Sequence, residues 1–191
     1  MLAEAIRPFV DASPEQVRAL RAHYELVVRW NQVVNLTRID DWRQAVTRHY
    51  GESAILCSGL GWEAATVVDI GSGGGFPGVP LAILNPHSRV TLVESDQRKG
   101  AFLKEACRHM ENCRVLIARS ESVEGEFEWL VSRAVTWADV EPAAARLAKR
   151  VAILVGGTVP ESLSVRWIEH RRLPWGSHRF LLIGEVVSRG T

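Results

Sequence analysis

The sequence predicts an α/β fold in which an N-terminal helical cap precedes a mostly parallel sheet of seven strands. Two observations lead to this prediction. From Thr66 onward, short β-branched runs alternate with helical segments, which is typical of βαβ units in a parallel sheet. Before Thr66, apolar residues recur at helical spacing. The 191 residues, 47% of them hydrophobic, suit a single domain, with the cap over residues 1–60 and the sheet over residues 61–191.

The cap is expected to contain two helices. Ser13, Pro14 and Gln16 form an N-cap, a first-turn proline and a capping-box glutamine, so a helix should begin there. An apolar stripe then continues the helical period through Val17, Leu20, Tyr24, Val27 and Val34. A second helical stretch is predicted from Trp42 to Leu56, after the turn-like residues 35–38.

The sheet region is expected to alternate strands with helices. The strand candidates are residues 67–70, 90–93, 115–118, 129–131 and 151–155. Helices are predicted between them, near residues 79–84, 97–110 and 138–149. The last two strands, at 165–172 and 179–187, are joined by a link rich in turn residues, which favours an antiparallel hairpin.

A glycine-dense turn follows the first strand candidate, with the sequence Asp69-Ile-Gly-Ser-Gly-Gly-Gly-Phe-Pro-Gly78. Glycine permits positive φ and lets a ligand lie directly against the backbone. From Gly73 to Gly78 the turn also matches the Gly-x-Gly-x-x-Gly pattern of dinucleotide-binding loops. A nicotinamide or flavin cofactor is therefore one interpretation of this loop.

Three features favour S-adenosyl-L-methionine over a dinucleotide. Gly73 lies deep in the turn, whereas the first glycine of a dinucleotide loop directly follows its strand. Pro77 and Pro80 lack the N–H donors that a pyrophosphate needs. A carboxylate at Asp69 would repel phosphates but attract a sulfonium and an α-amino group. The residues of this segment that we assign to the cofactor are Asp69, Gly71, Gly73, Gly75 and Phe76.

Further cofactor contacts are expected at the same edge of the sheet. Glu94 ends the second strand candidate, where Rossmann-like folds place an acid against ribose hydroxyls. Ser120 and Glu121 follow the third strand candidate, where they could contact an adenine. Because three more glutamates follow Glu121, solvation of this acidic cluster is the alternative.

These motifs resemble the RsmG (GidB) family of 16S ribosomal RNA methyltransferases, which methylate N7 of guanine. The matching segments lie, in the family order, at residues 30–32, 35–38, 49–53, 69–82, 92–95, 99–103, 119–121 and 132–134. They include Trp-Asn-Gln, Asn-Leu-Thr-Arg, Gly-Phe-Pro-Gly-Val-Pro-Leu-Ala and Ser-Arg-Ala. The resemblance implies a Rossmann-like class I methyltransferase fold, with S-adenosyl-L-methionine as cofactor. The partner that it implies is 16S ribosomal RNA or a precursor of the small ribosomal subunit.

The resemblance also assigns individual residues. Family contacts to the cofactor fall on Gly71, Phe76, Ser120, Glu121 and Arg133. Arg133 could hold either the cofactor carboxylate or an RNA phosphate. The chain departs from the family at Glu52, where the family has Asp, and at Val155, where it has Lys. The segment at 157–163 is also too short for the usual helix, so the differences concern the substrate more than the cofactor.

A basic C-terminal segment is the candidate RNA surface. It carries Arg166, Arg171, Arg172, Arg179 and Arg189 against Glu169 and Glu185. Such an excess of arginine suits phosphate contacts, and we assign Arg171 and Arg172 to substrate binding together with Arg133. Guanine N7 has an accessible lone pair and needs no general base, so no catalytic acid or base is assigned.

Composition restricts the other classes of function. The net charge of +1 gives no global attraction to nucleic acid or membranes, and the three cysteines lack the spacing of a metal site or a disulfide framework. Without a signal pattern or a long apolar run, we expect a cytoplasmic, metal-free monomer. The alternatives left open are methylation of another RNA or a small molecule, a non-catalytic ribosome-assembly module and a dinucleotide oxidoreductase.

Overall fold

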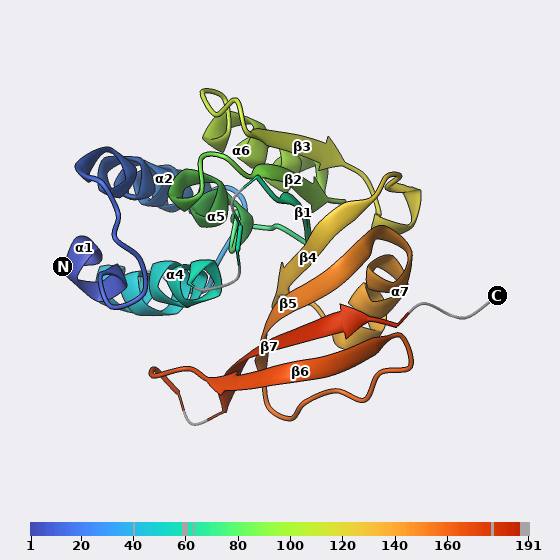
Figure 1. The fold of residues 1–191 in the computed structure, drawn as a ribbon. Coiled ribbons are helices and arrows are strands. Elements are labelled where there is room, and N and C mark those ends of the chain that lie inside the picture. The colour runs from blue at the N-terminus through green and yellow to red at the C-terminus, as the bar shows by residue number, and fades with distance from the viewer. Residues whose placement is uncertain (40, 59–60, 63, 177, 188–191) are drawn as a thin grey trace.

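A computed structural model describes residues 1–39, 41–58, 61–62, 64–176 and 178–187. Within these residues, seven strands form one sheet in the order β3-β2-β1-β4-β5-β7-β6 (Figure 1). The strands are β1 (Thr66–Ile70), β2 (Arg89–Glu94), β3 (Cys113–Ile117), β4 (Phe127–Arg133), β5 (Ala148–Gly156), β6 (Val165–Arg172) and β7 (Arg179–Val186). The first five strands run parallel, and β7 runs antiparallel to both β5 and β6. The predicted mostly parallel sheet and its C-terminal hairpin are confirmed.

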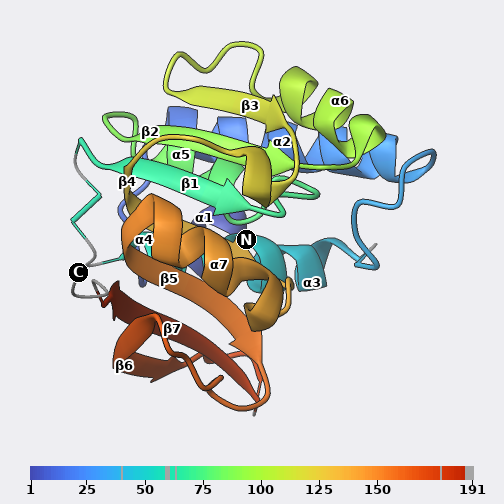
Figure 2. The ribbon, with the colours of Figure 1, turned by 90° about the vertical axis from the view of Figure 1, so that its right-hand side faces the viewer.

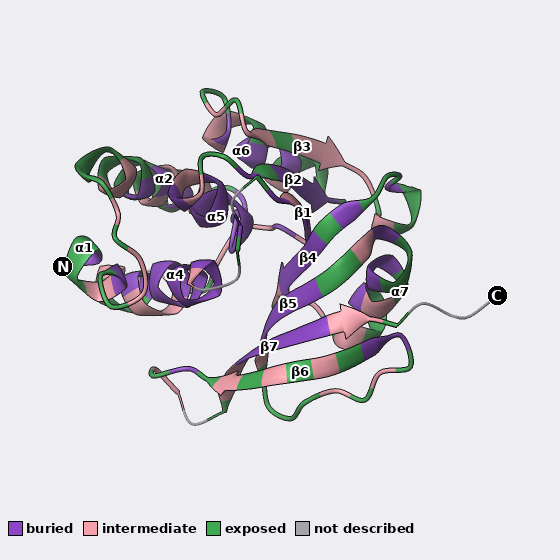
Figure 3. Ribbon diagram, viewed as in Figure 1, coloured by how far each residue is buried: buried purple, intermediate pink, exposed green. Residues whose placement is uncertain are grey.

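Helices cover both faces of this sheet. The helical elements are α1 (Leu2–Ile6), α2 (Pro14–Asn31), α3 (Trp42–Ala45), η1 (Val46–Gly51), α4 (Glu52–Cys57), α5 (Gly78–Leu84), α6 (Gln97–Ala106), η2 (Ser120–Ser122) and α7 (Trp137–Leu147). One apolar core joins the N-terminal helices, α5 and α6 to the sheet, and a second core lies under α7 on the opposite face (Figure 2). Figure 3 shows buried residues along α4, α5 and the central strands, whereas burial alternates along β6.

The predicted start of the cap helix is confirmed atom by atom. The Ser13 hydroxyl accepts a hydrogen bond from the backbone N–H of Gln16 at 3.2 Å, and the Gln16 side chain accepts one from Ser13 N–H at 2.8 Å. The Gln16 amide also donates to the carbonyls of Ile83 and Leu84, at the end of α5. The capping residue therefore ties the N-terminal helices to the layer on the sheet.

Several boundaries differ from those expected. The helical stretch from Trp42 is confirmed but divides into α3, a π-helical turn at η1 and α4. Helix α1 was not predicted, and α2 ends at Asn31, so the buried Val34 lies beyond it. Helix α6 ends at Ala106 rather than near 110, and Lys149 lies in β5 instead of α7 because β5 pairs with β4 from Ala148 onward.

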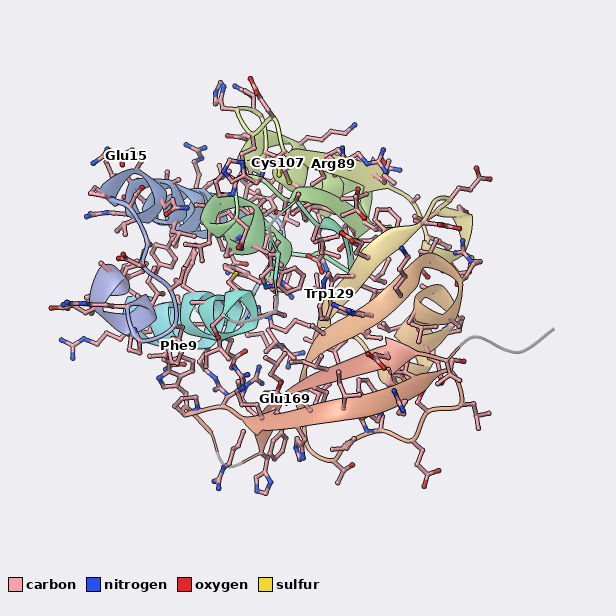
Figure 4. All side chains as sticks on the ribbon, in the orientation of Figure 1. Phe9, Glu15, Arg89, Cys107, Trp129 and Glu169 are labelled. Carbon is pink, nitrogen blue, oxygen red and sulfur yellow. The ribbon has the colours of Figure 1, made fainter. Side chains whose placement is uncertain are left out.

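Two of the three cysteines approach each other between α6 and β3. The Sγ atoms of Cys107, labelled in Figure 4, and Cys113 are 3.0 Å apart, and all three cysteines are free thiols. The spacing of six residues across a turn gave no sign of this approach. Among the described residues, no cluster of three or more His, Cys, Asp or Glu side chains could hold a metal ion, and no helix is long and apolar enough to cross a membrane.

Candidate cofactor and substrate site

The glycine loop connects β1 to α5 and is tied to the end of β2. Gly71, Gly73 and Gly75 have φ values of 73°, 53° and 83°, a region that strongly favours glycine. The Ser72 hydroxyl donates to the Asp69 carbonyl and accepts a hydrogen bond from the backbone N–H of Val93. The loop conformation expected from the glycines is therefore held by neighbouring backbone groups.

A cavity of about 530 Å³ opens at the carboxyl ends of β1 to β4. This size is within the usual range of small-molecule sites. Its lining includes Gly71, Glu94, Ser120, Glu121, Val135 and Arg146. A Cβ atom at Gly71 would lie 2.5 Å from Cγ2 of Val135, so a side chain would collide with the cavity wall. Four of the predicted cofactor residues thus line one cavity.

Glu94 joins the cavity wall to the glycine loop. Its side chain is buried, with Oε2 accepting from the backbone N–H of Gly73 and Oε1 from that of Asp96, both at 2.9 Å. A carboxylate has about four acceptor sites, so two remain for other donors. Glu94 can therefore hold the loop and also accept hydrogen bonds from ligand hydroxyls.

The two residues predicted to contact the adenine, Ser120 and Glu121, lie on a short 3-10 turn. The Ser120 hydroxyl donates to Glu121 at 3.3 Å, and the Ser120 carbonyl accepts from Arg146 at 2.8 Å. Arg146 comes from α7 and also lines the cavity. The turn is therefore held from the opposite cavity wall by Arg146, which is not among the predicted site residues.

Asp69 lies beneath the loop rather than on the cavity wall. Its Oδ2 accepts from the backbone N–H of Gly78 at 3.1 Å, at the start of α5, while Oδ1 has no partner among the described residues. Complete burial raises the pKa of this carboxyl to about 7, and the hydrogen bond from Gly78 opposes the shift. The geometry thus gives Asp69 contacts within the protein, at the junction of loop and helix.

Gly75 and Phe76 face the N-terminal helices. A Cβ atom at Gly75 would lie 2.9 Å from Nε2 of His23, which belongs to α2. The Phe76 ring is buried and stacks on His49 with ring centroids 4.4 Å apart. These two predicted cofactor residues therefore hold the loop against the cap, and neither lines the cavity.

Arg133, the last residue of β4, also points toward the cap. Its Nη1 donates to the carbonyl of Arg48 at 2.8 Å and to Nδ1 of His49 at 2.9 Å. With Nδ1 accepting, the His49 proton lies on Nε2, which donates to the Thr37 hydroxyl at 2.9 Å. Burial and the charge of Arg133 lower the pKa of His49 to about 3, so this ring is neutral.

A buried ion pair lies beside Arg133. Glu52 is fully buried and accepts two hydrogen bonds from Arg179 on β7, at 2.5 and 2.6 Å. Arg133 Nη1 is 3.8 Å from the same carboxylate. Glu52 is the position where the chain departs from the family's Asp, and its partner lies 127 residues away, where no local signal identifies it.

Two of the predicted substrate arginines, Arg171 and Arg172, make no hydrogen bond or ion pair with this cluster among the described residues. Arg171 is held by Glu169 of β6, labelled in Figure 4, at 2.6 Å, and Arg172 is exposed at the end of the same strand. Arg166 pairs with Glu185 at 2.7 Å. The remaining basic residue of the segment, Arg189, lies outside the described residues. The assignment of Arg171 and Arg172 to substrate binding stays a prediction.

Comparison with known proteins places the chain in a family. A family model described as rRNA small subunit methyltransferase G (GidB) matches residues 16–151. The chain belongs to this family. A relative named ribosomal RNA small subunit methyltransferase G, from Xanthomonas euvesicatoria pv. vesicatoria (strain 85-10), is 41% identical over 146 residues, covering 69% of this chain and 68% of the relative. One of the same name from Cereibacter sphaeroides is 41% identical over 128 residues, covering 64% and 62%.

The fold agrees with this family assignment. A SAM-dependent methyltransferase from Aquifex aeolicus has a TM-score of 0.60 at 14% identity, covering 84% of this chain and 98% of that one. Magnesium protoporphyrin IX methyltransferase from Synechocystis PCC 6803, with bound SAH, has a TM-score of 0.64 at 9% identity, covering 87% and 94%. The chain spans 68% of the length of the Xanthomonas euvesicatoria relative and 56% of that of a relative from Xanthomonas campestris. The family match includes every cofactor candidate and stops before β6 and β7.

Proposed function

We propose that this chain transfers a methyl group from S-adenosyl-L-methionine to N7 of a guanine in 16S ribosomal RNA. The observation that carries the proposal is the cavity walled by Gly71, Glu94 and the turn at Ser120, in a chain of the methyltransferase G family. The position beyond the carboxyl ends of parallel strands is where such sheets bind ligands. Relatives named as small-subunit ribosomal RNA methyltransferases support the substrate.

The residues present fit this cofactor. Gly71 lines the cavity with its backbone and no side chain, and Glu94 keeps acceptor sites for the ribose hydroxyls. The turn at Ser120 and Glu121 would lie along the adenine, as the sequence predicts. Arg133 does not line the cavity, so its contact with the cofactor carboxylate stays a prediction. When bound, the cofactor would supply an activated methyl group.

The protein's contribution would be orientation and charge rather than proton transfer. Guanine N7 attacks through a lone pair that carries no proton, so no side chain must act as a base. Holding N7 in line with the methyl carbon and the sulfur converts a bimolecular encounter into a positioned one. The buried network of Arg133, Glu52 and Arg179 would help this orientation by fixing the protein wall beside the bound guanine.

The proposal is tested by methyl transfer from labelled S-adenosyl-L-methionine to 16S ribosomal RNA and small subunits that lack the modification. We expect one labelled 7-methylguanine per small subunit, mapped by mass spectrometry of nuclease fragments. Label in transfer RNA only, or in another base, would reassign the substrate. Binding of a nicotinamide dinucleotide without binding of S-adenosylhomocysteine would overturn the cofactor as well.

A further inference from the structure

A second cavity, of about 320 Å³, adjoins the candidate cofactor cavity. It lies beyond the carboxyl ends of β4 and β5, and both cavities are lined by Val135. Its other walls include Trp137, Val155, Gly156 and Arg179. A molecule in the second cavity would therefore lie directly beside one in the first.

Arg179 reaches this cavity because of the strand register. It is the first residue of β7 and pairs with Gly156 at the end of β5. Since β7 runs antiparallel, its first residue lies at the same edge as the carboxyl ends of the parallel strands. Arg179 thereby supplies a cation beside Val155, although β5 carries none at that position.

The cluster around Arg179 has an excess of positive charge. One carboxylate, Glu52, faces two guanidinium groups, those of Arg179 and Arg133. Asp69, the other buried acid near Arg133, has its pKa raised to about 7 by burial, so it is only partly ionised at neutral pH. A cluster of this composition attracts an anion.

Arg179 also has hydrogen-bond donors to spare. A guanidinium carries five N–H groups, and Glu52 engages one at Nε and one at Nη2. Nη1 makes no hydrogen bond to any described residue, and a quarter of the side chain is exposed. Glu52 thus fixes one edge of the guanidinium plane while the other edge remains available at the cavity.

The other arginines of the hairpin that the structure describes differ from Arg179. Arg166 is 71% exposed and pairs with Glu185, and Arg171 pairs with Glu169. Neither lines the second cavity, and neither does Arg172. Their charges lie on a solvated surface, where an ion pair contributes little.

We propose that Arg179, positioned by Glu52, binds a phosphate of the RNA strand whose nucleotide enters the second cavity. The inference rests on the proposed function and identifies Arg179 as a residue that contacts a phosphate of the RNA substrate. Arg lends itself to this role because its planar fork can bind a carboxylate along one edge and a phosphate along another. Glu52 is a positioning residue, since it acts on the RNA only through Arg179.

The test is the salt dependence of binding to a 16S ribosomal RNA fragment, measured for wild type, Arg179→Gln and Arg21→Gln. The control removes an arginine that is also paired with a glutamate, Glu25, but lies on α2, outside the basic C-terminal segment. We expect Arg179→Gln to weaken binding about 10-fold and to reduce the log-log salt slope by about one unit, while Arg21→Gln leaves both unchanged. Affinity for S-adenosylhomocysteine should stay at the wild-type value in both variants.

A second variant keeps the test decisive if Arg179→Gln fails to fold, since that change leaves Glu52 buried without its main partner. The double variant Glu52→Gln with Arg179→Gln removes both charges and should show the same loss of slope. A folded variant with the wild-type slope and affinity would overturn the phosphate contact. If wild type bound the cofactor but neither bound nor methylated ribosomal RNA, the proposed function would fail first, and this inference with it.

Discussion

At the scale of single residues, burial decides what each acid and histidine can do. Glu94 is buried at the cavity wall with two backbone donors, whereas Asp69 is buried beneath the loop with one. Glu94 is the last residue of β2 and Asp69 the last but one of β1, so position along the strand hardly separates them. The neutral rings of His23 and His49 fill the space between the loop and the cap.

Replacing Glu94 with alanine should weaken cofactor binding. Loss of a buried carboxylate that accepts from hydroxyl donors costs roughly 1.5–3 kcal/mol. We expect calorimetry to show that loss for S-adenosylhomocysteine, together with a small loss of stability from the freed Gly73 N–H. Glu126→Ala, an exposed glutamate just before β4, is the control and should bind as wild type. Equal affinities would assign Glu94 to loop structure alone.

Acid should destabilise the protein through its buried histidines. Burial lowers the pKa of His23 from 6.5 to about 3, so protons bind the unfolded chain more tightly than the folded one between these values. The free energy of unfolding that His23 contributes is therefore fully present above pH 6.5 and is lost as the pH falls toward 3. At about pH 5 the loss should be on the order of 2 kcal/mol. Urea unfolding of wild type and His23→Phe between pH 7 and 5 measures this loss, which should be smaller in the variant. Parallel curves would show that His23 does not contribute.

At the scale of elements, the loop between β1 and α5 and the pairing of β7 with β5 build the two cavities. The loop lies against β2 through backbone hydrogen bonds from Gly71 and Ser72 to the Val93 carbonyl, so its shape is set locally. Strand β7 instead brings a distant residue, Arg179, to the edge where β5 ends. A π-helical turn at η1 places His49 and Tyr50 inward against Phe76.

Gly71→Ala should abolish cofactor binding because the added Cβ would collide with Val135. Gly73 is less informative, since a Cβ there has nothing nearer than 3.8 Å. Gly61→Ala is a matched control, with a similar positive φ and nothing within 4 Å of the added atom. We expect Gly61→Ala to lose about 1 kcal/mol of stability from the left-handed backbone, and Gly71→Ala to lose more because of the added collision with Val135. Only Gly71→Ala should lose affinity. Calorimetry with S-adenosylhomocysteine distinguishes them, and retained binding in Gly71→Ala would contradict the cofactor placement.

At the scale of the whole molecule, the N-terminal helices share a core with the sheet. Leu20 and Val27 of α2 belong to the same buried cluster as Leu81 of α5 and Trp129 of β4, which is labelled in Figure 4. The second core, under α7, is built from the other face of the same strands. We therefore propose that residues 1–60 fold as part of a single domain.

Unfolding in urea should follow one transition for the cap and the sheet. Because the cap supplies part of the sheet's core, separating the two would expose apolar surface on both. Far-UV circular dichroism and tryptophan fluorescence should give coincident curves, and a chain starting at residue 61 should not fold. Two separate transitions, or a folded truncated chain, would show that the cap is an independent unit.

The sequence by itself determined the alternation of strands and helices, the capping box at Ser13 and the loop that follows β1. These features depend on local backbone preferences and on periodicity, which neighbouring residues encode. Tertiary structure decided which predicted residues line the cavity: Gly71 and Glu94 do, while Asp69, Phe76 and Arg133 turn toward the protein interior. It also decided the pairing of Glu52 with Arg179. That contact depends on the register of β7 against β5 and on how α4 packs over the sheet, and neither is written in a local stretch of chain.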